Sequence, residues 1–165
     1  DFVLLEEELR FTDDFLSIQK LRFGDAFSYT ISVPAFLRQA RIPPSVIKSF
    51  AENAVKYARN MSREAKIDIR ASMQNREGET YLWLEVLDNG PGFSDEVLQT
   101  LQQKAQPFFD GRVHIGIANV RQRLELLYAG KAEVRLENRP DGGTHVSVTR
   151  PLNYGTEQPE KEETL

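Results

Sequence analysis

The sequence contains no cysteine, which excludes disulfides, thiolate metal sites and a cysteine nucleophile. It has no apolar run near the roughly 18 residues of a membrane-spanning helix, and no signal-peptide pattern at its start. A chain without cysteine suits a reducing compartment. We therefore expect a chain that is not embedded in a membrane and a cytoplasmic location.

Basic residues are not in excess, and the formal net charge is −4. Most of this charge lies in residues 153–165, where one lysine stands against four acidic residues, Glu157, Glu160, Glu162 and Glu163. The rest of the chain is nearly neutral and has no broad basic stripe that would follow a phosphate backbone. We expect no nucleic-acid partner, and a disordered acidic tail over 153–165.

The chain has 165 residues, of which 40% are hydrophobic, enough for one domain with its own core. Apolar periodicity and turn residues predict helices over 2–23, 43–60, 94–103 and 116–128, with Gly24 ending the first. Alternating patterns predict strands over 27–33, 65–73, 80–87, 132–137 and 144–149. Consecutive strands pair as hairpins, so the fold class expected is α+β: a two-layer α/β sandwich whose mostly antiparallel mixed sheet carries helices on one face.

Asp88 follows the strand over 80–87 and continues the parity of Leu82, Leu84 and Val86, so its carboxylate should point toward the buried side. A buried charge needs a donor partner. The glycines in Asn89-Gly90-Pro91-Gly92 let the backbone approach a ligand closely. An acidic acceptor beside such backbone suits a flat heterocycle with an exocyclic amine, such as adenine.

A tight turn capped by Asp88 explains the same residues equally well, because Asn-Gly is a common turn dipeptide. A calcium loop is a third option, but its alternating acidic ligands are missing.

The helix over 43–60 carries Asn53, Lys56 and Tyr57 beside its apolar stripe, with Ser49 next to Asn53. An amide, an ammonium and a phenol offer a metal ligand, a phosphate counter-charge and a ring to stack. Mg²⁺ needs only one or two protein oxygens besides phosphates and water. The alternative is a solvated helix face on which Glu52 and Lys56 form an ordinary surface ion pair.

Two further blocks contain glycine. His114-Ile115-Gly116-Ile117 opens a helix, where free N–H groups favour phosphate, although a flexible helix start explains it as well. Asp141-Gly142-Gly143-Thr144 fits a plain hairpin turn, with a Thr144 hydroxyl that could point at a phosphate.

Together these blocks have the order and spacing of one superfamily. The chain resembles the GHKL ATPases (gyrase, heat-shock chaperone, histidine kinase and MutL), and among them the catalytic domain of LytS- and YesM-type sensor histidine kinases. The resemblance rests on PPSVIKSFAENAVKYA, VLDNGPGF and HIGIANVRQRLELLYAG, with EELRFTDDFLSIQKLRFGDAF upstream. It covers about residues 6–151 and implies a Bergerat-type ATP-binding fold.

The resemblance implies ATP and Mg²⁺ as cofactors. Asp88 would accept from the adenine amino group, Asn53 would ligate Mg²⁺, and Glu52 would orient the attacking group as the catalytic residue. The other implied ATP-binding positions are Lys56, Tyr57, Gly90, Gly92, His114, Ile115, Gly116, Ile117 and Thr144. Residues 104–113 would form a mobile lid anchored by Phe108 or Phe109. His114 replaces a glycine of the family, which predicts a restrained lid or weaker phosphate contacts.

The phosphoacceptor histidine of such kinases is not identified here. The chain has two histidines, His114 in the glycine block and His145, which we expect to be exposed on a strand. The resemblance implies an acceptor segment upstream of Asp1, on the same or a partner subunit, in a membrane-anchored homodimer that passes phosphate to a response regulator. Residues 1–24 would be a helical leader from that segment and 25–152 the ATP-binding domain, with little turnover by itself.

Other functions are compatible with these residues. An anti-sigma-factor-type serine kinase or a free-standing GHKL ATPase would keep the pocket, and Lys56-Tyr57 argues against both. A degenerate docking domain is supported by His114 and opposed by Asn53, Asp88 and Gly92.

Overall fold

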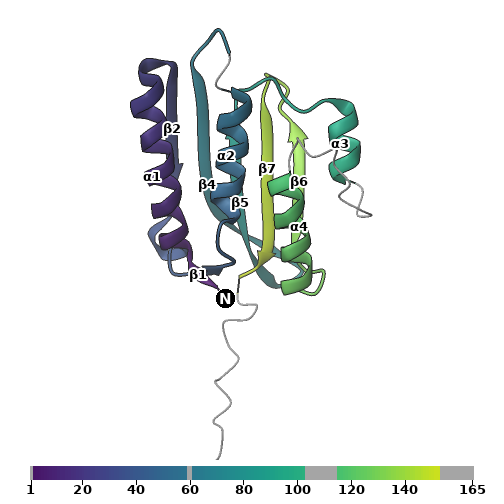
Figure 1. Cartoon of the computed structure of the whole chain (residues 1–165). Coiled ribbons are helices and arrows are strands. Elements are labelled where there is room, and N and C mark those ends of the chain that lie inside the picture. The colour runs from purple at the N-terminus through teal and green to yellow at the C-terminus, as the bar shows by residue number, and fades with distance from the viewer. Residues whose placement is uncertain (1, 59–60, 103–114, 153–165) are drawn as a thin grey trace, which may run out of the picture.

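The computed structural model describes residues 2–58, 61–102 and 115–152. The elements run β1 (Val3–Leu4), α1 (Leu5–Phe23), β2 (Phe27–Ser32), β3 (Arg41–Ile42), α2 (Val46–Ala58), β4 (Ala65–Arg76), β5 (Glu79–Asp88), α3 (Asp95–Gln102), α4 (Ile115–Leu127), β6 (Glu133–Asn138) and β7 (Thr144–Pro151) (Figure 1). The tail predicted to be disordered, 153–165, lies outside the described residues.

Five strands form one sheet in the order β2-β4-β5-β7-β6, and β1 pairs separately with β3. β4 with β5 and β6 with β7 form the predicted antiparallel hairpins, and β5 pairs antiparallel with β7. β2 runs parallel to β4, because α2 carries the chain across between them. The sheet is therefore mixed and mostly antiparallel, as predicted.

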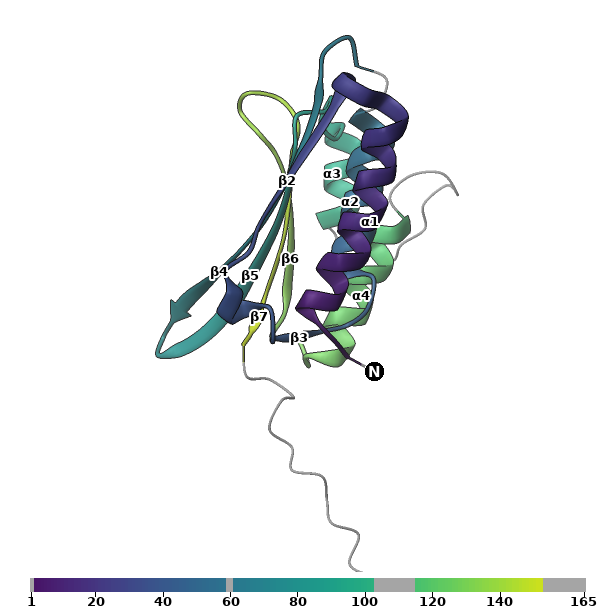
Figure 2. The ribbon, with the colours of Figure 1, turned by 90° about the vertical axis from the view of Figure 1, so that its left-hand side faces the viewer.

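The α-helices lie together on one side of this sheet, which gives the predicted two-layer arrangement (Figure 2). Apolar side chains of α1 and α2 pack with those of the central strands into one core, including Leu5, Leu9, Leu16, Ile47, Phe50, Ile69, Leu84, Val86 and Val148. Residues of the predicted leader thus belong to the same core as the rest. Among the described helices, none is both long and apolar enough to cross a bilayer.

The boundaries depart from the sequence prediction at two helix starts. The first helix begins at Leu5 and not at residue 2, because Val3 and Leu4 pair with Ile42 and Arg41. The second begins at Val46, after Pro43 and Pro44, because Ser45 has a positive φ of 66° that a helix cannot continue through. Gly24 ends α1 as predicted, with φ 57°.

Candidate functional site: a cleft at the end of β5

Asp88 ends β5 and is buried, with 5% of its surface exposed, as the strand parity predicts. Its Oδ1 accepts the backbone N–H groups of Gly90 at 2.8 Å and Thr144 at 3.3 Å, and Oδ2 accepts the Thr144 hydroxyl. Burial raises the pKa of Asp88, although these hydrogen bonds and nearby Arg139 act in the opposite direction. The carboxylate thus has the donor partners that a buried charge requires.

The glycine-rich segment after Asp88 is both a turn and one wall of a cleft. The Asp88–Gly90 hydrogen bond caps the turn, as the turn interpretation predicts. A Cβ at Gly90 would lie 2.9 Å from Asp88 Oδ1, and Gly92 has a φ of 84°. Side chains at either position would disturb the carboxylate or strain the loop. The turn therefore also forms a wall of the cleft.

The cleft joins three of the four sequence blocks. It is lined by Asn53, Tyr57, Asp88, Pro91, Gly92, Phe93 and Thr144. These residues enclose about 10 Å³ of open space, room for about one water molecule. The predicted meeting of the helix over 43–60, the glycine-rich turn and the final hairpin is thus present in the fold.

On α2, Asn53 and Tyr57 face this cleft, and burial raises the pKa of Tyr57. Lys56 Nζ lies 5.6 Å from the centroid of the Tyr57 ring, a cation–π distance. Glu52 is exposed on the helix surface and forms an ion pair with Lys48 at 3.5 Å, one turn earlier. Glu52 thus forms a surface ion pair, as the alternative interpretation expects, but its partner in the structure is Lys48 and not the expected Lys56.

Thr144 lies at the floor of the cleft, but its hydroxyl donates to Asp88. The hypothesis that this hydroxyl points at a phosphate is thereby replaced: Thr144 orients the carboxylate. The preceding Gly143 has a φ of 99°, and a Cβ there would lie 1.9 Å from the Asp88 carbonyl oxygen. Only glycine permits this approach of β7 to the end of β5.

The second glycine block is only partly described. His114 and the predicted lid, 104–113, with Phe108 and Phe109, lie outside the described residues, and of Ile115 only the backbone, at the start of α4, is described. Gly116 is exposed, and its hypothetical Cβ lies 3.8 Å from Ser49 Cβ on α2. Ile117 is fully buried, so any ligand contact there falls to its backbone.

Two residues before the final hairpin turn support the cleft and were missed from the sequence. The Asn138 amide accepts from the Phe93 N–H and donates to the Phe93 carbonyl, both at 2.8 Å. Arg139 Nη1 donates to the Asp88 carbonyl at 2.9 Å. The available signal was a polar pair at the end of a predicted strand, followed by Pro140-Asp141 and two glycines. That signal does not say which loop the pair contacts.

The sequence predicts an exposed His145, and this prediction is wrong: the residue is half-buried. On β7 its side chain is 22% exposed, and Nε2 lies 2.8 Å from Glu85 Oε1. Trp83 covers it with ring centroids 6.3 Å apart. Glu85 and Trp83 belong to the adjacent strand β5, and their side chains cover His145 on the face of the sheet that carries no helices.

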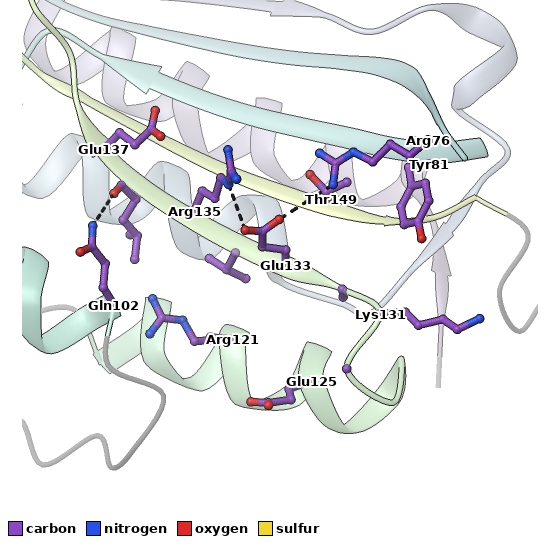
Figure 3. A pocket seen from close by; sticks show the side chains of 14 residues that line it. Arg76, Tyr81, Gln102, Arg121, Glu125, Lys131, Glu133, Arg135, Glu137 and Thr149 are labelled. Carbon is purple, nitrogen blue, oxygen red and sulfur yellow. Dashed lines mark hydrogen bonds and ion pairs between the residues drawn. The ribbon is translucent and has the colours of Figure 1, made fainter. Parts of the chain in front are cut away.

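A second cavity, of about 540 Å³, lies between β6, α4 and the end of α3 (Figure 3). Its wall contains charges of both signs, some of them paired with one another, such as Arg135 with Glu133 at 2.9 Å. Gln102 donates to the Leu136 carbonyl at 3.5 Å. None of the residues predicted for the nucleotide site lines this cavity.

Comparisons with known proteins agree with this geometry. Residues 40–154 match the family described as histidine kinase-, DNA gyrase B- and HSP90-like ATPase. The chain is 26% identical to the sensor histidine kinase YesM of Bacillus subtilis over 152 residues, 92% of this chain and 24% of YesM. It is 32% identical to the sensor protein LytS of Staphylococcus haemolyticus, over 86% of this chain and 24% of that protein. The chain thus spans about a quarter of these relatives.

Solved structures share the fold. The catalytic domain of histidine kinase ThkA superposes with a TM-score of 0.63 at 19% identity, covering 92% of this chain and 97% of that one. The Acinetobacter baumannii histidine kinase AdeS gives a TM-score of 0.64 at 14% identity, covering 93% of this chain and 67% of that one.

Because the matched family model covers most of the chain, this protein belongs to the histidine kinase-, DNA gyrase B- and HSP90-like ATPases.

Proposed function

We propose that this domain binds Mg-ATP in the cleft at the end of β5 and is the catalytic part of a sensor histidine kinase. The observation that carries the proposal is the buried Asp88 carboxylate, held beside a glycine-rich loop and opposite Asn53 and Tyr57. Asp88 Oδ1 accepts two backbone N–H groups, whereas Oδ2 accepts the Thr144 hydroxyl alone, and a carboxylate oxygen can accept a further hydrogen bond. A fixed, desolvated acceptor of this kind favours a ligand with an amino group, because hydrogen bonds to a charged acceptor are strong. The chemistry of this set of groups fits adenine.

The residues around the cleft also fit a phosphate chain and its metal. Among the described residues there is no group of three or more His, Cys, Asp or Glu side chains that could hold a metal by themselves. Mg²⁺ bound through the Asn53 side-chain oxygen and phosphate oxygens needs no such cage, and it would supply charge neutralisation at the phosphates. Lys56 and the backbone N–H groups from His114 to Ile117 would bind phosphate oxygens, and Glu52 would orient the attacking group.

The proposed partners are supported by the relatives, which are named as sensor histidine kinases and sensor proteins. We infer that residues 25–152 form the ATP-binding domain and that 1–24 connect it to a phosphoacceptor region elsewhere in the full protein. That protein would be a membrane-anchored homodimer with this part in the cytoplasm, and a response regulator would receive the phosphate.

Calorimetric titration with ATP, with and without Mg²⁺, tests the site. We expect saturable binding by the wild type, loss of binding in Asp88→Asn, and a changed Mg²⁺ dependence in Asn53→Asp. Retention of the folded spectrum in both variants is the control. No binding by the wild type at millimolar ATP would overturn the nucleotide assignment and favour a docking domain.

A further inference from the structure

Glu8 of α1 caps the N-terminus of α2 from 37 residues away. Its carboxylate is buried, with 2% of the residue exposed. Oε2 accepts the Ser45 N–H at 2.9 Å and Oε1 accepts the Lys48 N–H at 3.2 Å. The first N–H groups of a helix have no partner within the helix, and negative charge is favoured there. A cap of this kind is normally local, whereas this one joins two helices.

The chain at the start of α2 is held from a second side by α4. Arg123 Nη2 donates to the Pro44 carbonyl at 2.6 Å. Between the two contacts, Ser45 adopts a φ of 66°, which costs a residue with a side chain on the order of 1–2 kcal/mol. An unfavourable backbone conformation persists where the surrounding contacts over-determine it. Glu8 and Arg123 supply those contacts, one from each flanking helix.

Helices α2 and α4 also lie close together one turn further along α2. The hypothetical Cβ of Gly116, in the first turn of α4, lies 3.8 Å from Ser49 Cβ. Asn53 follows Ser49 by one turn and lines the cleft. A change in the distance between α2 and α4 at Pro44–Ser45 should therefore also change the distance between Asn53 and the start of α4.

We propose that Glu8 and Arg123 are positioning residues that fix α2 against α4, and thereby the two walls between which the phosphates of ATP would bind. The expected effect on ATP binding rests on the proposed function, whereas the contacts of Glu8 and Arg123 with the start of α2 do not. It also makes α1 part of the site: a displacement of the leader helix moves the cap of α2, and with it Asn53.

The test combines four single variants and one double alanine variant with one control. Glu8→Ala and Arg123→Ala remove the contacts, whereas Glu8→Gln and Arg123→Lys keep an acceptor and a donor. The control is Ile69→Val or Ile69→Ala, whichever matches the melting temperature of Glu8→Ala; Ile69 is buried on β4, paired with Ile31 and Val86. ATP affinity is measured by calorimetry at a temperature at which every variant is folded.

We expect both alanine variants to bind ATP about fivefold or more weakly than the Ile69 control, and the conservative variants to recover part of the loss. The double alanine variant should lose less than the product of the single losses, because both residues hold one segment. A second readout needs no nucleotide: the nuclear Overhauser contact between Ser49 and Gly116 should weaken in both alanine variants and persist in the control.

Affinities within twofold of the control, or an unchanged Ser49–Gly116 contact, would overturn the positioning role. If an alanine variant does not fold, the conservative variants decide between the same outcomes. Failure of the wild type to bind ATP would overturn the proposed function alone, since the Ser49–Gly116 contact still reports the junction.

Discussion

The side-chain amide of Asn138 pairs with the backbone of Phe93 in both directions, each hydrogen bond measuring 2.8 Å. The pairing joins the end of β6 to the glycine-rich loop, which no strand pairing reaches. The Asn138 side chain thus makes the two hydrogen bonds that a neighbouring strand would otherwise make with Phe93.

We expect Asn138→Asp to weaken both folding and ATP binding. The aspartate has no N–H for the Phe93 carbonyl and places a charged oxygen before it, an unfavourable contact that should cost about 1–3 kcal/mol of unfolding free energy. Urea denaturation and calorimetry measure the two effects. Asn75→Asp in the exposed part of β4 is the matched control. Equal stability of the two variants would show that the Asn138 pairing contributes nothing.

Gly143→Ala should be among the most damaging single changes in the chain. Its φ is 99°, and the added Cβ would lie 1.9 Å from the Asp88 carbonyl oxygen and 2.7 Å from Asn89 Cα, both backbone atoms that cannot move independently. We expect a loss above about 3 kcal/mol, or no folding, by thermal denaturation.

The control for this variant is Gly78→Ala. Gly78 also has a positive φ, 82°, but nothing lies within 4 Å of its hypothetical Cβ. Its loss should be about 1 kcal/mol, the cost of left-handed backbone alone. Similar losses for the two alanine variants would contradict the steric role of Gly143.

The ionisation of Asp88 predicts opposite effects of pH on folding and on binding. Its pKa in the folded state is raised above the ordinary 3.8, chiefly by burial. The folded protein therefore binds this proton more tightly than the unfolded chain, so the contribution of Asp88 to stability falls as pH rises from 3.8 through the raised value. ATP binding needs the ionised acceptor and should weaken as pH falls through that value.

Comparison of wild type with Asp88→Asn isolates this group. The difference in unfolding free energy between them should change with pH only in that window. A difference that stays constant from pH 3 to pH 8, measured at about one-unit steps, would contradict the assignment.

Arg150 is a fully buried cation. Its guanidinium donates to the carbonyls of Pro151, Leu152 and Arg41 and lies 5.6 Å from the Tyr128 ring centroid, and burial lowers its pKa. We expect Arg150→Met to cost about 3 kcal/mol, since buried carbonyls lose their donors while the methionine keeps much of the volume. Arg135→Met, on the exposed strand β6, should change stability by less than about 0.5 kcal/mol. Chemical denaturation compares the two.

The domain by itself should release phosphate from ATP only slowly, because the proposed reaction needs an acceptor histidine, which we infer to belong to another part of the protein. A coupled phosphate assay at saturating ATP measures the rate. Glu52→Gln should lower even this residual rate, whereas Lys48→Gln, which removes the ion-pair partner of Glu52, should leave it close to the wild-type value. Rapid release by the wild type would favour a free-standing ATPase.

Local patterns were sufficient for much of this structure. The burial of Asp88 followed from strand parity, and the end of α1 from Gly24, since both depend on near neighbours in sequence. The contacts of Asn138, Arg139 and Gly143 with Asp88 and the glycine-rich loop could not be predicted, because they depend on how β6 registers against β7 and β7 against β5. Glu8 escaped prediction for a different reason: a charged residue in an amphipathic helix predicts a solvated face, and only the packing of α1 against α2 reverses that.

β1 and the end of β7 lie at one end of the sheet (Figure 1), and the end of β5, which carries Asp88, lies at the other. Val3 pairs with Ile42, the residue after Arg41, and the Arg41 carbonyl accepts a hydrogen bond from Arg150. Pro151 pairs with Tyr81 near the start of β5. Asp88 is seven residues further along that strand, about 24 Å at roughly 3.4 Å per residue. A rigid rotation of the domain by about 10° around this end of the sheet would move Asp88 by about 4 Å. Under the proposed function, so small a rotation would be enough to bring a phosphate to its acceptor or take it away.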